Sequence, residues 1–224
     1  MINILPGGLG LDAAVVAPLS TWDTSNLYGT FTFSNSNRTA VGTPSGGPGA
    51  YVNALKGTAS HATGKFYFEV SIDVVSNHSP TYDPYSTSIG VVNGSWGSNT
   101  IIGGSSGLDV GLKVDSSSTF WSIYQDAIVS PVKFGTGIAA GQIIGVAIDS
   151  SSGNVNVWFR LNANWLNGGT PSTSFNPSGP DVSSVWPTSA LTFPAASEGN
   201  GQFTLNVGNA AFANAPPSGF VAWG

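Results

Sequence analysis

Hydrophobic and polar residues alternate along much of this chain, most clearly over residues 65–75. An alternation with a period of two predicts a β-strand that is buried on one face and hydrated on the other. The predicted buried face carries the larger apolar side chains: Phe66, Phe68, Val70, Ile72 and Val74. The opposite face, which we expect to be wet or half-wet, carries Tyr67, Glu69, Ser71 and Asp73.

The same period predicts strands over residues 142–149 and 154–160, joined by a short turn that ends at Gly153. Glycine reaches positive φ without steric cost, so these two segments are expected to form a hairpin. No window shows a helical period, and 30 glycines and 14 prolines interrupt the chain at short intervals. The pattern is typical of an all-β sandwich or barrel. The remaining strand candidates are 203–208 and, more weakly, 28–33, 88–93, 108–114, 119–124 and 190–194.

No linker divides the chain, so we expect one β domain over residues 21–224, preceded by an N-terminal arm or edge segment, residues 1–20. The arm either adds a strand to its own sheet or docks on a neighbouring subunit or particle protein by strand addition. It has no basic leader, and Pro6 and Gly7 interrupt its apolar stretch, which makes it a poor secretory signal. No apolar run is long enough to insert into a membrane.

Charge is scarce in this chain. Only 8% of residues are Asp, Glu, Lys or Arg, against about 25% in an ordinary soluble domain. The net charge is −5 and the six basic residues are scattered singly, so the sequence gives no electrostatic basis for binding nucleic acid. The absence of cysteine excludes disulfides, zinc ribbons and thiol nucleophiles.

Four stretches of the chain together resemble a SPRY domain. They are KGTASHATGKFYFEVSI, SIGVV, AAGQIIGVAIDSSSGNVNVWF and FTLNVGNAAFANAPPSGFVAW, which lie within residues 54–92 and 138–223. The PPSGF element near the end is the most specific of the matching motifs. The resemblance implies a two-sheet, concanavalin-like antiparallel sandwich. In its family this domain is a binding scaffold, so the resemblance brings no catalytic residue and no cofactor.

One departure from the SPRY pattern suggests the kind of protein in which this domain occurs. Where SPRY domains usually have a short turn after the hairpin, this chain runs VWFRLNANWLNGGTPSTSFNP, which looks like the variant of bacteriophage and prophage structural proteins. That likeness, with the charge-poor composition, predicts a virion location and a non-catalytic role as a tail-fibre or capsid-decoration module. A homo-oligomer such as a trimer would suit that role. The alternative is a free-standing SPRY-type protein-binding module.

A polysaccharide-cleaving enzyme is a third alternative, because concanavalin-like sandwiches also carry glycoside hydrolases. Such enzymes need two carboxyl groups about 5–10 Å apart. Glu69 and Asp73 share a strand face but lie about 13 Å apart by strand rise, so they do not form such a pair. We therefore expect no enzyme, with Glu69 as an ordinary residue of the polar strand face.

Histidines and loop aspartates give no strong metal signal. His61 and His78 are too far apart in sequence for a compact metal site and are expected to be solvated loop residues. Calcium stays open as a minor alternative at the oxygen-bearing residues Asp83, Asp109 and Asp115.

Aromatic residues in polar loops are the candidate binding residues. Their neighbours are small and polar, which favours an exposed ring that stacks on a sugar. The alternative is that these rings pack at the ends of the sandwich. The candidates for binding host-surface glycan or a partner are Trp96, Trp165, Trp186, Tyr82 and Tyr85. Three other tryptophans lie near strands and are expected in the core or a self-association surface: Trp22, Trp121 and Trp223.

Overall fold

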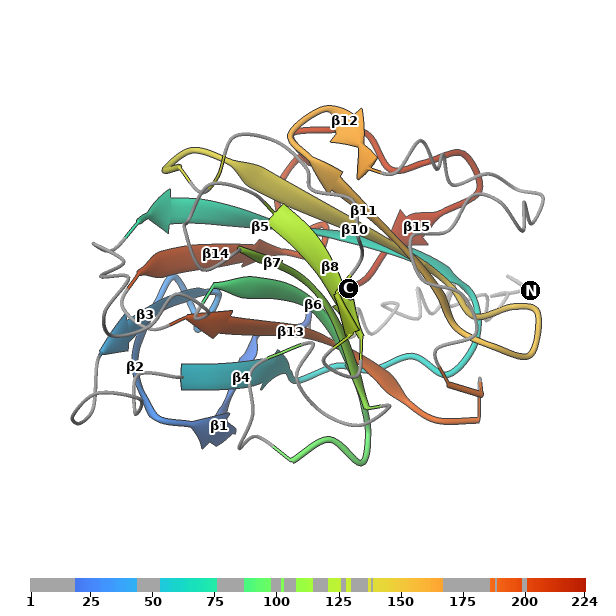
Figure 1. Ribbon diagram of the computed structural model, residues 1–224, viewed down its shortest axis with the longest axis horizontal. Coiled ribbons are helices and arrows are strands. Elements are labelled where there is room, and N and C mark those ends of the chain that lie inside the picture. The colour runs from blue at the N-terminus through green and yellow to red at the C-terminus, as the bar shows by residue number, and fades with distance from the viewer. Residues whose placement is uncertain are drawn as a thin grey trace, which may run out of the picture.

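Fifteen strands in two sheets make up the described part of the computed structural model (Figure 1). The predicted all-β, two-sheet sandwich is therefore confirmed. All described strand pairs are antiparallel except one, the pair of β15 (Val221–Ala222) with β5 (Lys65–Val74), which is parallel. The structure describes residues 19–43, 53–75, 87–97, 102, 108–114, 121–125, 128–129, 137, 139–166, 186–187, 189–198 and 201–224.

The first sheet has seven strands in the order β1-β4-β13-β6-β7-β8-β9. Their bounds are β1 Trp22–Tyr28, β4 Asn53–Gly57, β13 Thr192–Glu198, β6 Ser88–Asn93, β7 Asp109–Val114, β8 Trp121–Gln125 and β9 Ile128–Val129. The second sheet has eight strands: seven lie in the order β12-β11-β10-β5-β14-β3-β2, and the eighth, β15, pairs with β5. Their bounds are β12 Asn164–Trp165, β11 Asn156–Leu161, β10 Ile143–Asp149, β5 Lys65–Val74, β14 Gln202–Asn206, β3 Thr39–Thr43, β2 Thr30–Ser34 and β15 Val221–Ala222.

Most strands predicted from alternation are present, with small shifts at their ends. The predicted hairpin is formed by β10 and β11, with Asp149 paired to Asn156 and Gly153 at a φ of 95° in the turn. The single strand expected over 28–33 is wrong, because Gly29 adopts a φ of 86° and separates β1 from β2. This break sends the chain from one sheet to the other.

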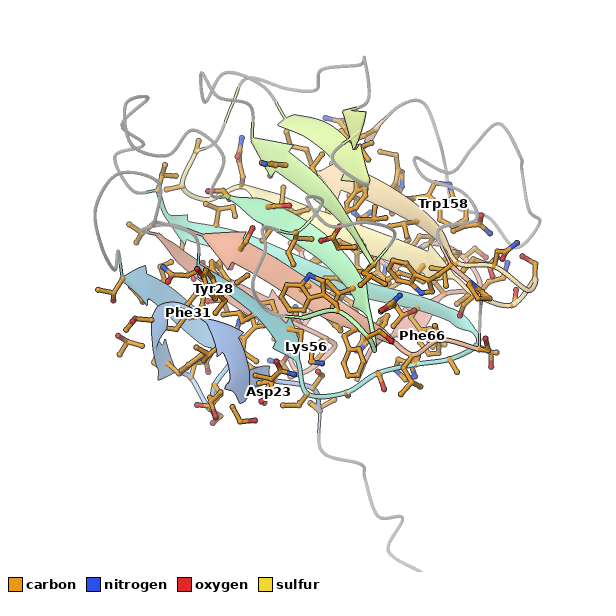
Figure 2. All side chains as sticks on the ribbon, turned by 60° about the horizontal axis from the view of Figure 1, so that its bottom comes forward. Asp23, Tyr28, Phe31, Lys56, Phe66 and Trp158 are labelled. Carbon is orange, nitrogen blue, oxygen red and sulfur yellow. The ribbon has the colours of Figure 1, made fainter. Side chains whose placement is uncertain are left out.

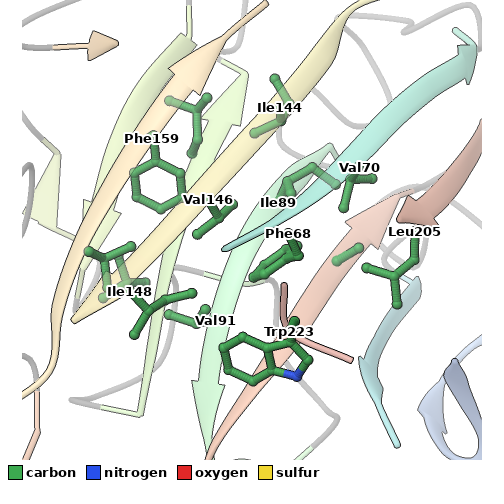
Figure 3. Close-up of a cluster of buried hydrophobic side chains, with 14 of the residues drawn as sticks. Phe68, Val70, Ile89, Val91, Ile144, Val146, Ile148, Phe159, Leu205 and Trp223 are labelled. Carbon is green, nitrogen blue, oxygen red and sulfur yellow. The ribbon is translucent and has the colours of Figure 1, made fainter. Parts of the chain in front are cut away.

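The core lies between the inner faces of the two sheets. Strand β5 contributes Phe68, Val70 and Ile72, all at most 1% exposed, as its alternation predicts. They meet side chains from β10, β11, β14 and, across the sandwich, β6 (Figure 3). The other large side chains labelled in that view are Ile89, Val91, Ile144, Val146, Ile148, Phe159, Leu205 and Trp223.

The outer face of the eight-stranded sheet is covered where β5 begins. The prediction of a wet face is wrong for Tyr67 and Glu69, which are 0% and 3% exposed. The cause is the covering segment, residues 207–220, which leaves β14 and crosses the outside of the sheet. It then returns to pair with β5 as β15. Farther along β5, Ser71 and Asp73 are half-buried, as predicted.

The last turn of this path places a tryptophan in the core. Trp223 is 1% exposed and packs edge-on against Phe68, with ring centroids 5.7 Å apart. Its backbone N–H donates to the Tyr67 carbonyl at 3.0 Å, and its indole N–H donates to the Ala59 carbonyl at 3.3 Å. Residues near the end of the chain therefore complete the centre of the sandwich.

The Trp223→Ala substitution should lower the free energy of unfolding by about 3–5 kcal/mol, since it removes a fully buried ring. Chemical denaturation of the full chain measures this loss. The control is Val221→Ala on the same short strand, where the side chain is 58% exposed and a change within about 0.5 kcal/mol is expected. Equal losses in both variants would show that the end of the chain does not hold the core.

Candidate binding site

A buried carboxylate ties the covering segment to the sheet. Glu69 accepts hydrogen bonds from the backbone N–H groups of Ala213 at 2.8 Å and Asn214 at 3.0 Å. It also accepts one from the Tyr67 hydroxyl at 2.8 Å. Charge-assisted hydrogen bonds of this kind are among the stronger ones in proteins. The expectation that Glu69 is an ordinary residue of the polar strand face is therefore wrong. Glu69 anchors residues 213–214 to the sheet.

Arg160 on β11 is the cation of this network. Its guanidinium lies 3.6 Å from the Glu69 carboxylate, and the two side chains are 6% and 4% exposed. It donates to the Tyr67 hydroxyl and to the carbonyls of Asn214 and Ala215. Its charge also lies over the Trp165 ring, 4.9 Å from the ring centroid. The ion pair is thus completed by the Tyr67 hydroxyl, by the backbone of the covering segment and by the Trp165 ring.

Strand register explains why these two charges meet. Gly145 on β10 is paired with Glu69 of β5 on one side and with Arg160 of β11 on the other. A Cβ at position 145 would come 2.4 Å from the Tyr67 hydroxyl and 2.8 Å from the Arg160 Nε. Only glycine leaves room for the ion pair to close above the middle strand.

Tyr67 stays protonated inside this network. Burial, followed by the negative charge of Glu69, raises the pKa of the Tyr67 hydroxyl far above its ordinary value. The hydroxyl therefore donates to Glu69 and accepts from Arg160 across the physiological range. The hydrogen bonds and the ion pair of Glu69 hold its carboxylate in one orientation.

A pocket opens beside this anchor on the outer face of the eight-stranded sheet. Its volume is about 270 Å³. The floor comes from β5 and β14, including the polar residues Ser71, Thr204 and Asn206. One wall comes from Asn209, Ala210, Ala211 and Ala213 of the covering segment, and Glu69 fixes this wall at one end. The Asn206 amide fixes its middle by donating to the Ala211 carbonyl at 3.2 Å.

Asp73 lies one hydrogen bond beyond the pocket floor. Its carboxylate accepts from Ser71 at 2.6 Å, from Thr204 at 2.5 Å and from Gln202 at 3.3 Å. All three donors are neutral. Within the described ranges no ion pair of Asp73 is formed, so its negative charge is oriented by neighbours but not neutralised. The Glu69 carboxylate itself lines the pocket, and the Asp73 carboxylate lies behind the hydroxyl groups of Ser71 and Thr204.

Of the predicted aromatic residues that the structure describes, only Trp165 lies on this face. Trp165 on β12 is half-buried, and it covers Arg160 rather than lining the pocket. Trp186 is 4% exposed in the main core, and its indole N–H donates to the Thr192 hydroxyl at 3.1 Å. Tyr82 and Tyr85 lie outside the described residues.

Trp96 packs on the outside of the seven-stranded sheet. It is 3% exposed and joins Ala54, Val92, Ile102 and Ala195 in a second apolar cluster. The expectation that small polar neighbours leave an indole exposed is therefore wrong for Trp96 and Trp186. Glycan binding by the five predicted aromatics stays a prediction. Of the tryptophans expected in the core, Trp22 and Trp223 are buried, and the Trp121 side chain lies outside the description.

The histidine and aspartate considered as metal ligands that the structure describes, His61 and Asp109, are packed within the fold. His61 is half-buried, stacks on Phe66 at 3.8 Å and bonds the Trp223 carbonyl through Nε2 at 2.6 Å, so it is not the solvated loop residue expected. Asp109 is buried in β7. The described residues contain no group of three metal-ligating side chains. His78, Asp83 and Asp115 lie outside them.

Three solved SPRY domains share this fold. A human SPRY domain is 17% identical, with a TM-score of 0.56 over 83% of this chain and 99% of that one. The SPRY domain of human HERC1 is 11% identical, with a TM-score of 0.54 over 85% and 99%. The TRIM65 PSpry domain is 17% identical, with a TM-score of 0.53 over 84% and 91%.

The sequence itself matches no family model and no curated protein. At these identities the structural likeness establishes the SPRY-type fold, which confirms that part of the resemblance seen in the sequence. It provides no support for the bacteriophage or prophage type. The described part of the chain has no helix with the length and apolar character to cross a bilayer.

The Arg160→Ala substitution should lower the free energy of unfolding by about 3–5 kcal/mol, because it leaves the buried Glu69 carboxylate without its cation. Chemical denaturation gives this loss, and limited proteolysis should show earlier cleavage within residues 207–220. Arg38→Ala is the matched control: this half-buried arginine makes one side-chain hydrogen bond, to Asn35, and about 1 kcal/mol is expected. A loss no greater than the control's would contradict the anchoring role of the network.

Proposed function

We propose that this chain is a non-catalytic protein-binding module that takes an extended partner segment in the pocket beside Asp73. The observation that carries the proposal is the oriented carboxylate of Asp73, held by three neutral donors at the edge of a pre-formed pocket. The SPRY-type fold, which serves as a binding scaffold in the resembling family, supports the same class of function.

The chemistry of the pocket selects a partner with a basic side chain. A Lys or Arg side chain that reaches Asp73 would gain a charge-assisted hydrogen bond that no cation of the described residues supplies. The net charge of −5 would also favour the approach of a basic partner. The hydroxyl and amide groups of Ser71, Thr204 and Asn206 suit the polar backbone of an extended peptide.

The shape of the pocket fits a narrow chain rather than a flat ring. Its wall is built from Ala210, Ala211 and Ala213, whose small side chains let a partner backbone approach closely. The wall is held by Glu69 and Asn206, so little ordering is needed on binding. A pocket that is ordered before binding lowers the entropic cost of association.

Binding of a peptide library to the immobilised full chain tests this proposal. The peptides carry Lys, Arg, Gln or Glu at a fixed central position and random residues elsewhere. We expect the wild type to retain the Lys and Arg sets, and Asp73→Asn to weaken their binding by about tenfold to a hundredfold. Asp23→Asn is the control, since this carboxylate lies in β1 of the other sheet and bonds Ser25 locally.

Two results would overturn the proposal. The first is a wild type that retains no basic set in preference to the Gln and Glu sets. The second is an equal effect of Asp73→Asn and Asp23→Asn on the basic sets. A further variant, Ala211→Phe, places a ring in the pocket at an exposed position and should weaken binding without lowering stability.

A virion role is a second candidate, favoured by the charge-poor composition and by the long insertion after the hairpin. In that setting the module would be a tail-fibre or capsid-decoration protein, with other virion proteins or host-surface glycan as partners. Mass spectrometry of purified particles from the source culture tests it. Many copies per particle would favour decoration, a few copies in multiples of three would favour a fibre, and no copies would exclude the role.

A further inference from the structure

Strand β2 forms an outer edge of the eight-stranded sheet. It pairs with β3 on one side and has no strand on the other within the described residues. Thr30, Thr32 and Ser34 are exposed, whereas Phe31 and Phe33 are half-buried and pack against the core. Figure 2 shows Phe31 at this side of the sandwich, where β1 and β2 lie. Such an edge presents backbone N–H and C=O groups that another strand can pair with.

The other edges of the described sheets are short or irregular. At β1, the register with β4 shifts between Trp22 and Leu27, and Asp23 turns back to bond Ser25, so this edge is bulged and charged. The edges at β9 and β12 are two residues long. Natural proteins protect sheet edges with such bulges, charges and short strands. By contrast, β2 pairs with β3 over five consecutive residues without a register shift.

The sequence around β2 is free of charge. No Asp, Glu, Lys or Arg occurs between Asp23 and Arg38, in a chain whose net charge is −5. Two copies of an acidic chain repel each other at most surfaces, but not where both present this uncharged segment. A charged partner strand would gain nothing here, whereas a second uncharged strand pairs without burying a charge.

The residues of β2 are also complementary to themselves. In an antiparallel pair centred on Thr32, Phe31 of one copy faces Phe33 of the other, and Thr30 faces Ser34. Residues that face each other in an antiparallel pair lie on the same side of the sheet. The Phe31–Phe33 pairs would therefore lie on the side of the joined sheet that faces the two cores. Aromatic pairs and paired hydroxyl residues are favourable across strands. A twofold axis through Thr32 would give both copies the same set of strand contacts, as in most homodimers.

We propose that two copies of this chain associate through antiparallel pairing of their β2 strands, which joins the two eight-stranded sheets into one. This association is independent of the pocket beside Asp73. In the dimer, the exposed hydroxyl side chains of both strands lie on the outer face, and the half-buried phenylalanines lie on the core side.

Sedimentation equilibrium of the full chain, from low to high micromolar concentration, tests the association. We expect the wild type to pass from monomer to dimer, and Thr32→Lys to weaken the dimer at least about tenfold, because the two lysines would face each other across the axis. The side chain of Thr32 is exposed, so the variant should fold. The control, Thr24→Lys, adds the same charge at an exposed position of β1 and should not change the association.

The outcomes separate this inference from the peptide-binding proposal. A wild type that stays monomeric at the highest concentration would overturn the inference, as would a dimer that Thr32→Lys leaves intact. Hydrogen exchange gives a second readout: backbone amides of residues 30–34 should exchange more slowly as concentration rises. Asp73→Asn should dimerise like the wild type, whatever its effect on peptide binding.

Discussion

The buried ion pair between Glu69 and Arg160 is the interaction on which the outer face of this sandwich depends. It brings together β5, β11 and the covering segment, and it does so above Gly145, which has no side chain to intervene. Burying two charges has a high desolvation cost, so such a pair is sustained only when hydrogen bonds complete it. Here Tyr67 and the backbone of residues 213–215 complete it. The wall of the pocket is a consequence of that arrangement.

The two faces of β5 show how far the sequence could predict the fold. Its inner face follows the alternation at Phe68, Val70 and Ile72, but the prediction is wrong for Val74 at the end of the strand, which is 51% exposed. Its outer face could not be predicted from period alone, because residues 207–220 have no periodic pattern to indicate that they cover a sheet. A sharper signal was present: in a chain with two glutamates, Glu69 and Arg160 fall on outward positions of β5 and β11, the two strands that flank β10.

The candidate site was less predictable than the fold. Polar neighbours suggested exposure for Trp96 and Trp186, but an indole between short polar residues can still be covered by distant parts of the chain, as both are. The pocket combines residues from β5, β14 and the turn before β3, which are far apart in the sequence. Neither Asn35 nor Asp73 carries a motif that marks it as part of a site. Only the strand register brings these residues to one face.

The position of Trp223 has a consequence for how the chain reaches its folded state. The central strand β5 is completed by β10, β14 and β15, with Tyr67 paired to Ala222. Contacts between residues so distant in sequence slow folding, because the intervening chain must be ordered before they form. During synthesis, β5 therefore emerges long before its partners do. Until residues 221–223 leave the ribosome, its apolar face has no complete core to enter, which makes this interval the one most open to aggregation.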